Sequence, residues 1–169
     1  SEMCIRDSFN MEEHLDFLNR MFDEVYGDVT TYLEDEENEG LFLRCMTGAS
    51  DSREVQYSLS KHNVVSPVRV RMILMNREKQ IVYTSFGQEA MNLHRTEFNK
   101  IVADNALKAN LPIYTTVYYF SGDSSECVFA KPVYQHGVLA GFVMAYLNGN
   151  DWGSLFSCLL YTSDAADEL

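Results

Sequence analysis

The stretch KPVYQHGVLAGFVMAYLN, from Lys131 to Asn148, decides the fold class of this 169-residue chain. It holds a polar Gln135, His136, Gly137 segment between two runs rich in valine, leucine and aromatic residues. Short runs of this kind on either side of a glycine turn predict an antiparallel hairpin. We expect its strands at Cys127 to Tyr134 and at Val138 to Leu147.

Three further strands are expected upstream of this hairpin. Tyr114 to Phe120 is followed by the turn sequence SGDSS, and together with the hairpin it predicts a three-stranded meander. Val68 to Met75 alternates between two sets of side chains and leads through the polar Asn76 to Lys79 into a second alternating run, Gln80 to Phe86. This period of two predicts a separate hairpin.

Helical periodicity accounts for much of the remaining chain. Asn10 to about Leu33 predicts a long amphipathic helix, with Asn10 as its N-cap and Glu13 in the capping-box position. Further helices are expected over part of Leu41 to Cys45, from Ser52 to His62 and between Gly87 and Leu111. The residues predicted to face inward are Leu15, Leu18, Phe22, Val25, Val29 and Leu33 in the first helix, Val55 and Leu59 in the third, and Phe98, Ile101, Val102 and Ala106 in the last.

The acidic run EDEENEG, Glu34 to Gly40, lies between the first two helices. A run of like charges predicts a solvated turn, and a cation site on it is the alternative.

The order of these elements leaves few topologies. Five strands in two groups, joined by one helical crossover, are too few and too antiparallel for a doubly wound fold. We therefore predict an α+β domain: a five-stranded antiparallel sheet with a long N-terminal helix and with the helices packed on one face.

Within this frame, two stretches resemble a known family. KPVYQHGVLAGFVMAYLN resembles the closing hairpin of Cache sensor domains, where a Pro-Val pair, a glycine turn and an apolar strand beginning at a small glycine recur. MILMNREKQIVYTSF, Met72 to Phe86, is similar to their opening hairpin, and the long helix from Asn10 resembles their stalk helix. The resemblance covers nearly all of Phe9 to Phe156 and implies a PAS-like sheet.

The resemblance also implies a function. Such domains are extracytoplasmic small-molecule sensors of bacterial membrane receptors, here of the histidine kinase or diguanylate cyclase type. Their long helix leaves one membrane span and a second span leads to a cytoplasmic output domain, so both spans are expected outside this chain. A homodimer through the long helix is expected. The alternative is a ligand-free PAS-like module that only dimerises.

In Cache domains the ligand lies between the sheet and the segment that connects the two groups of strands. On this sequence the resemblance points to Tyr83, Ser85, Tyr114, Tyr118, Phe120, Phe129 and Lys131 as ligand-binding residues. Asp123 is the candidate to meet a ligand amine. Core packing is the competing interpretation, because tyrosine and phenylalanine are common in strands. Unlike amino-acid-binding Cache domains, the chain has its one tryptophan, Trp152, after the last strand, and no Arg-Trp pair precedes Tyr114.

The two ends of the chain have a common feature. Met3 to Ser8 can be encoded as ATG TGT ATA AGA GAC AGN, whose reverse complement contains TGT CTC TTA TAC ACA, the codons of Cys158 to Thr162. One short DNA element therefore fits both ends in opposite orientations, as in a translated sequencing adapter. We expect residues 1–8 and 157–169 to be adapter-derived and residues 9–156 to be the sensor lobe, a fragment of a longer protein.

Charge and cysteine content restrict the function further. The formal net charge is −12, and about −8 without the two ends, which argues against a nucleic-acid partner. Apart from the ends, only Cys45 and Cys127 remain, and we expect two inert buried thiols, with a disulfide as the alternative. A Cys127–His136 pair is the only nucleophile arrangement in sight, and nothing orients it. We expect no enzymatic activity, no metal and no cofactor.

Overall fold

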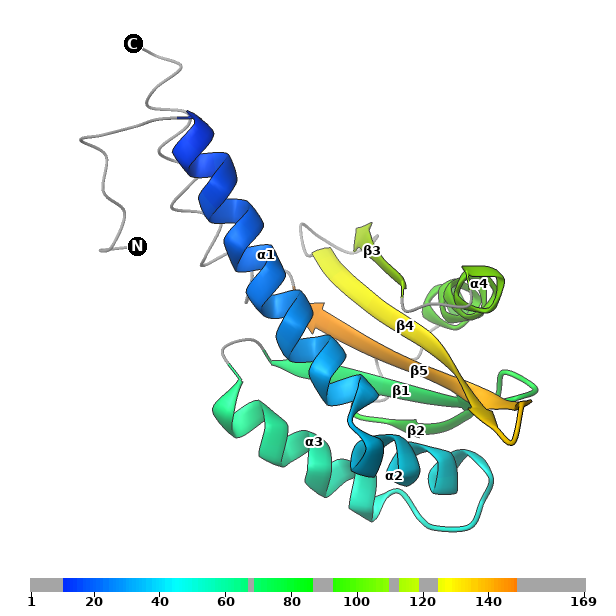
Figure 1. Ribbon diagram of the computed structural model, residues 1–169. Helices are drawn as coiled ribbons and strands as arrows, with labels where there is room; N and C mark the ends of the chain where they lie inside the picture. Colours follow the sequence, from blue (N-terminus) through cyan, green and yellow to red (C-terminus); the bar gives the residue numbers. More distant parts are fainter. Residues whose placement is uncertain (1–10, 67–68, 87–92, 110–112, 119–124, 149–169) are drawn as a thin grey trace.

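A computed structural model describes residues 11–66, 69–86, 93–109, 113–118 and 125–148. Within these ranges it describes all side chains except those of residues 11–15, 17–19, 21–22, 93–96, 98, 109, 113–127 and 148. The elements, shown in Figure 1, are α1 (Met11–Glu34), α2 (Glu36–Met46), α3 (Arg53–Val65), β1 (Val70–Asn76), β2 (Ile81–Thr84), α4 (Leu93–Ala109), β3 (Ile113–Tyr118), β4 (Ser125–Gln135) and β5 (Val138–Asn148).

The strands form one sheet in the order β2-β1-β5-β4-β3, and every neighbouring pair is antiparallel. The two hairpins are therefore joined by β1 pairing with β5, the last strand in the chain. The predicted α+β class, the antiparallel sheet and the long N-terminal helix are confirmed.

Both hairpin turns depend on residues with positive φ. His136 and Gly137, between β4 and β5, have φ of 51° and 79°, the combination that a two-residue turn needs to match the twist of its strands. In the β1–β2 turn Lys79 has φ of 63°, and the Asn76 side chain accepts a hydrogen bond from Gln80 N at 2.9 Å. The turns predicted at these two places are confirmed.

Helices cover both faces of the sheet, and here the prediction of helices on one face was wrong. Figure 1 shows α1, α2 and α3 on one side and α4 on the other. Each side has its own core: alternate residues of β1, β4 and β5 pack with α1 to α3, and the residues between them pack with α4. The physical reason is in β5, whose residues from Gly141 to Leu147 are all buried, as in a strand that is covered on both faces.

The acidic run Glu34 to Gly40 is mostly the start of a helix, so the predicted turn was wrong. Asp35 is the N-cap of α2 and its carboxylate accepts from Asn38 N at 3.1 Å. The first turn of α2 contains Glu36, Glu37 and Glu39, whose negative charges interact favourably with the helix dipole. In the part of the chain that the structure describes, no three His, Cys, Asp or Glu side chains are grouped to hold a metal ion.

The inward faces of the helices agree with the predictions in part. Val25, Val29 and Leu33 of α1 and Val55 and Leu59 of α3 are buried as expected. In α4, Ile101 was predicted to face inward but is 56% exposed. The residues of α4 that face the sheet are Asn99, Val102, Ala103 and Ala106, which follow the i, i+3, i+4, i+7 spacing of one helical stripe. The predicted N-cap residue Asn10 and the side chains of Glu13, Leu15, Leu18, Phe22 and Phe98 lie outside the described part.

Cys45 and Gly141 are two small residues in the region where α2 packs on the sheet. Cys45 is a buried free thiol, as predicted, and burial raises its pKa, with a smaller effect from Asp51. Gly141 of β5 lies so close to its neighbours that a Cβ would be 2.1 Å from the Met75 carbonyl oxygen and 2.9 Å from Met46 Sδ. This glycine therefore allows α2, β1 and β5 to approach closely. None of the described helices has the length and apolar character to cross a membrane.

Candidate ligand site between helix α4 and the sheet

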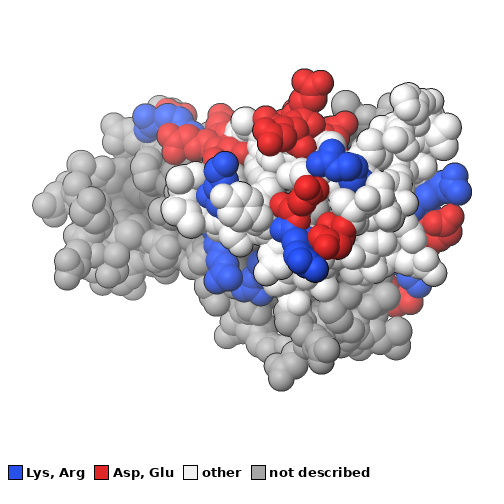
Figure 2. Space-filling model, turned by 90° about the horizontal axis from the view of Figure 1, so that it is seen from below, with Lys and Arg blue, Asp and Glu red and all other residues white. Residues whose placement is uncertain are grey.

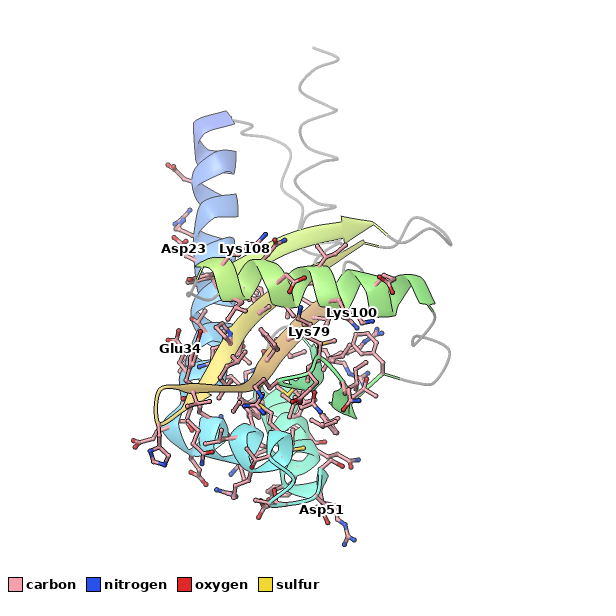
Figure 3. All side chains as sticks on the ribbon, turned by 90° about the vertical axis from the view of Figure 1, so that its right-hand side faces the viewer. Asp23, Glu34, Asp51, Lys79, Lys100 and Lys108 are labelled. Atoms are coloured by element: carbon pink, nitrogen blue, oxygen red, sulfur yellow. The ribbon has the colours of Figure 1, made fainter. Side chains whose placement is uncertain are left out.

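Helix α4 lies across one face of the sheet, as Figure 3 shows. The floor beneath it is apolar: Ile73, Met75, Val128, Ala130, Phe142 and Met144, all buried. The helix contributes Val102, Ala103 and Ala106, three small side chains. Because these side chains are small, the backbone of α4 can lie close to the sheet. The layer between α4 and the sheet is therefore thin, and its residues are apolar.

One polar pair interrupts this apolar layer. Asn99 of α4 and Tyr146 of β5 are both almost completely buried, and the Tyr146 hydroxyl donates a hydrogen bond to Asn99 Oδ1. The same hydroxyl is 3.8 Å from Met144 Sδ. Among the described residues, nothing accepts a hydrogen bond from Asn99 Nδ2, although that nitrogen is buried.

A buried amide donor without an acceptor is uncommon in folded proteins and calls for a specific explanation. Exchange of the two amide atoms would pair the nitrogen with Tyr146 and leave the oxygen unpaired instead, so in either orientation one buried polar atom of Asn99 has no partner among the described residues. Small-ligand sites typically combine an apolar wall with a few fixed polar groups. Asn99 and Tyr146 have this character, with a donor that suits an oxygen acceptor of a ligand.

Aromatic and charged residues surround the pair. The Phe86 ring meets the Tyr146 ring edge to face, with 5.2 Å between centroids and 85° between planes. Arg71, opposite Tyr146 in the β1–β5 register, places its guanidinium carbon 5.4 Å from the Phe86 centroid. Lys79 of the β1–β2 turn forms an ion pair with Asp104 and so ties that turn to α4 (Figure 3).

The residues predicted to bind ligand are divided between the two faces. Phe129 and Tyr83 pack into the core of α1 to α3, and Lys131, which has the same strand parity as Phe129, pairs with Glu39 of α2 at 2.6 Å. These three therefore lie on the side away from α4, which corrects their expected position under the connecting segment. The reason is the strand period of two: Val128 and Ala130 are the β4 residues that face α4.

The other predicted site residues have different outcomes. Ser85 follows β2, and its Oγ accepts from Met72 N at 2.7 Å. Tyr114 is the register partner of Phe129, and Tyr118 is that of Ser125, with both side chains outside the described part. Phe120 and Asp123 also lie outside it. The prediction that these residues bind ligand stays a prediction.

Sequence reasoning missed Asn99 and Tyr146. Tyr146 belongs to the apolar run of β5, where a core residue is expected. The inward face of the last helix was predicted from its apolar residues, Phe98, Ile101, Val102 and Ala106, so the polar Asn99 was left out of it. A usable signal did exist: Asn99, Val102 and Ala106 are spaced by three and four residues, which places a polar amide on an apolar stripe.

A second polar cluster joins the three helices on the opposite face. Tyr32 Oη and Ser58 Oγ are 3.0 Å apart, and Ser58 Oγ donates to Asn38 Oδ1 at 2.9 Å. Burial raises the pKa of Tyr32 to about 12 despite the Ser58 hydrogen bond. The His62 ring lies 4.3 Å from the Tyr32 ring, and burial lowers its pKa, opposed by Asp28 at 3.4 Å. This cluster joins α1, α2 and α3 into one layer.

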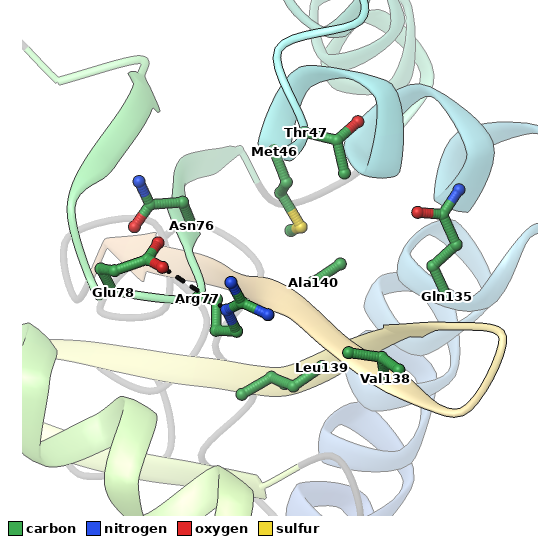
Figure 4. A pocket seen from close by; sticks show the side chains of 9 residues that line it. All are labelled: Met46, Thr47, Asn76, Arg77, Glu78, Gln135, Val138, Leu139 and Ala140. Carbon is green, nitrogen blue, oxygen red and sulfur yellow. Dashed lines mark hydrogen bonds and ion pairs between the residues drawn. The ribbon is translucent and has the colours of Figure 1, made fainter.

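The outer surface has shallow hollows beside these layers. One, of about 660 Å³, lies between α2 and α3 and mixes acidic, basic and aromatic side chains. Another, of about 280 Å³, lies where the two hairpin turns meet the end of α2, and Figure 4 shows Met46 pointing into it and Arg77 paired with Glu78. His62, whose Nε2 is buried without a hydrogen-bond partner among the described residues, lines the first hollow, but that nitrogen lies 3.4 Å from an Asp28 oxygen, whereas Asn99 Nδ2 has no such neighbour.

Comparisons with known proteins give the following. No protein-family model and no curated protein matches the chain. Similar solved structures include the ligand-binding domain of the Pseudomonas aeruginosa PAO1 amino acid chemoreceptor PctC in complex with GABA, with 16% identity and a TM-score of 0.48 over 79% of this chain and 60% of that one. A methyl-accepting chemotaxis protein X has 10% identity and a TM-score of 0.49 over 85% and 64% of the two chains. The ligand-binding domain of Campylobacter jejuni chemoreceptor Tlp3 in complex with L-valine has 12% identity and a TM-score of 0.46 over 88% and 68%. The chain thus spans less than two thirds of the first two structures.

Proposed function

We propose that residues 9–156 form the small-molecule sensing lobe of a membrane-anchored receptor, of the histidine kinase or diguanylate cyclase type, on the extracytoplasmic side of the membrane. The observation that carries the proposal is the buried Asn99 amide, held by Tyr146 between α4 and the sheet. The resemblance of the two hairpins to those of Cache domains supports it independently.

The ligand would bind between α4 and the sheet. Asn99 Nδ2 offers it a donor, the Tyr146 hydroxyl offers a second polar contact, and Phe86 with the apolar floor encloses the rest. A compound with a carbonyl or carboxylate oxygen fits this set best, because the unpaired group is a donor. Tyr114, Tyr118, Phe120 and Asp123 remain candidate contacts, since β3 adjoins α4 as well as β4.

The signal would pass through the sheet to α1. Met144 and Tyr146 of β5 face α4, and Val143, Ala145 and Leu147 on the same strand face the layer of α1 to α3. A ligand that repacks one face of β5 therefore acts on a strand whose other face touches that layer. A close-packed interior transmits such shifts, and a rigid helix in a homodimer would carry them onward.

A melting screen of the full chain against a library of small carboxylates, amides and amines tests this function. A compound at one hundred times its dissociation constant stabilises the folded state by about 2.7 kcal/mol, which corresponds to a rise in Tm of roughly 5 to 10 °C for a domain of this size. Tyr146→Phe should abolish the rise, whereas Tyr57→Phe, at a 70% exposed position on α3, should keep it.

A library without a single stabilising compound would favour the alternative, a ligand-free PAS-like module that dimerises through α1. The complete burial of Ala103 and Ala106 against the sheet is the observation on its side. Light scattering after size exclusion tests this alternative in one direction: it requires a stable dimer without any ligand, so a monomeric chain would exclude it.

A further inference from the structure

A separate cavity of about 300 Å³ lies at the β2 edge of the sheet, beside α3. The helix, the start of β1 and the end of β2 form its walls. Its lining residues are Gln56, Leu59, Ser60, Asn63, Arg69, Val70, Arg71, Tyr83, Thr84 and Ser85. Two arginines and several hydroxyl and amide groups thus line this cavity, and none of the described lining residues is a carboxylate.

A lining without a carboxylate among its described residues contrasts with the net charge of −12 of the chain. Over the face seen in Figure 2, acidic and basic side chains lie next to each other. Arg44, Arg53 and Arg77 each pair with a carboxylate within 3.4 Å. Among the residues that the structure describes, none forms such a pair with Arg69 or Arg71.

The walls of the cavity are held in place by hydrogen bonds to the backbone. The Asn63 side chain accepts from Val70 N at 2.8 Å and donates to Val70 O at 2.9 Å, which fixes α3 against β1. Ser85 Oγ accepts from Met72 N and fixes the end of β2. The Phe86 ring supports the Arg71 guanidinium at 5.4 Å. The backbone beside both arginines is therefore held in place, and Arg71 has a ring contact as well.

We propose that this cavity binds a small oxyanion, such as a phosphate or a short dicarboxylate. Guanidinium groups bind both through charge-assisted hydrogen bonds, often in pairs. The negative charge of the rest of the chain opposes this only weakly, because salt screens charges beyond about 8 Å at physiological ionic strength. Ser60 and Gln56, both exposed on α3, would add neutral donors at the rim.

Arg71 borders both this cavity and the site under α4, but the remaining lining residues do not belong to that site, and the proposal does not depend on the proposed sensing function. Arg69 takes no part in the Asn99 and Tyr146 pair, so its substitution tests the cavity alone. Tyr146→Phe serves as the reciprocal control, because it alters the site under α4 and should leave anion binding unchanged.

The test is a titration of the ¹⁵N-labelled full chain with inorganic phosphate, and in parallel with succinate, at an ionic strength held constant with sodium chloride. We expect saturable amide shifts centred on Ser60, Arg69 to Arg71 and Ser85. Arg69→Gln should weaken binding at least tenfold. Arg53→Gln, on a side chain that is 89% exposed at the other end of α3, should leave it unchanged. The two titrations show which oxyanion is preferred.

Ser60→Glu provides a second variant that does not remove an arginine. Ser60 is exposed on α3 and glutamate is a good helix former, so the fold should persist and the new carboxylate should compete with the anion. Shifts that grow linearly without saturation, or equal binding by the Arg69→Gln and wild-type chains, would overturn the proposal.

Discussion

Replacing Asn99 with leucine should make the chain more stable and, at the same time, insensitive to ligand. In the structure the Asn99 amide is fully buried, with one atom paired to Tyr146 and the other unpaired among the described residues. Leucine has the same branched outline and has no polar atoms. The substitution therefore removes a hydrogen bond and an unpaired donor together.

The two effects have opposite signs and different sizes. A buried donor without an acceptor costs about 1 to 3 kcal/mol. Loss of the hydrogen bond from Tyr146 costs about 0.5 to 1.5 kcal/mol, and that hydroxyl keeps its contact with Met144 Sδ. The first effect is the larger, so the net gain is about 1 kcal/mol. For a domain of this size such a gain raises Tm by roughly 2 to 4 °C.

The assay is urea unfolding followed by circular dichroism at 222 nm, analysed by linear extrapolation. Asn105→Leu is the matched control, because Asn105 is exposed on the same helix. It carries the same gain in helix propensity, about 0.5 kcal/mol or less, with no change in the buried layer. The difference between the two variants isolates the buried amide.

A loss of more than about 1 kcal/mol for Asn99→Leu relative to Asn105→Leu would refute the reasoning. It would mean that Asn99 Nδ2 is paired in solution and has nothing to offer a ligand. A stabilised Asn99→Leu chain that still responds to a hit from the melting screen would instead place the ligand elsewhere.

Three other substitutions test the frame around the site. Gly141→Ala should lower the free energy of unfolding by at least about 2 kcal/mol, because the new Cβ would overlap the Met75 backbone. Gly27→Ala, in open space on α1, should instead raise it by about 0.5 to 1 kcal/mol. Equal effects of the two substitutions would contradict the packing of α2 on β5. Glu39→Gln removes the charged partner of the buried Lys131 and should lower the free energy of unfolding by about 1 to 3 kcal/mol. Glu37→Gln, on the same helical turn, should change it by under about 0.5 kcal/mol. A Glu39→Gln chain as stable as this control would show that the ion pair does not contribute to stability. Burial lowers the pKa of His62, so the unfolded chain binds a proton at this residue more readily than the folded chain does, and the free energy of unfolding should fall as the pH drops from about 6.5 through the folded-state pKa. His62→Gln should flatten this dependence in urea unfolding between pH 7 and 5. An unchanged slope would show that protonation of His62 does not affect folding.

Much of the architecture was predictable from local patterns. The turn at His136 and Gly137, the alternation on either side of Asn76 and the helical stripe of Val25, Val29 and Leu33 each depend on residues close together in sequence. Such patterns act through backbone conformation and amphipathic burial, which a short window contains. The element order followed from them.

The site was much less predictable, because a strand pattern does not reveal which of its two faces meets which helix. Phe129 and Tyr83 were predicted to bind ligand under the connecting segment, but both pack against the core beneath α1 to α3, and Tyr83 also lines the cavity at the β2 edge. Tyr146 looked like an ordinary core residue, yet it holds the one buried asparagine of the described part. The difference arises from a contact between α4 and β5 whose two residues are 47 positions apart.

The sequence by itself determined the hairpins, the long helix and the α+β class, since periodicity and turn residues act over a few positions. Only the tertiary structure decided that α4 covers the second face, that an amide without an acceptor lies beneath it, and that two arginines at the sheet edge have no described carboxylate beside them. These features are set by which segments, distant in the chain, pack against each other, and that choice is made by burial and pairing in three dimensions.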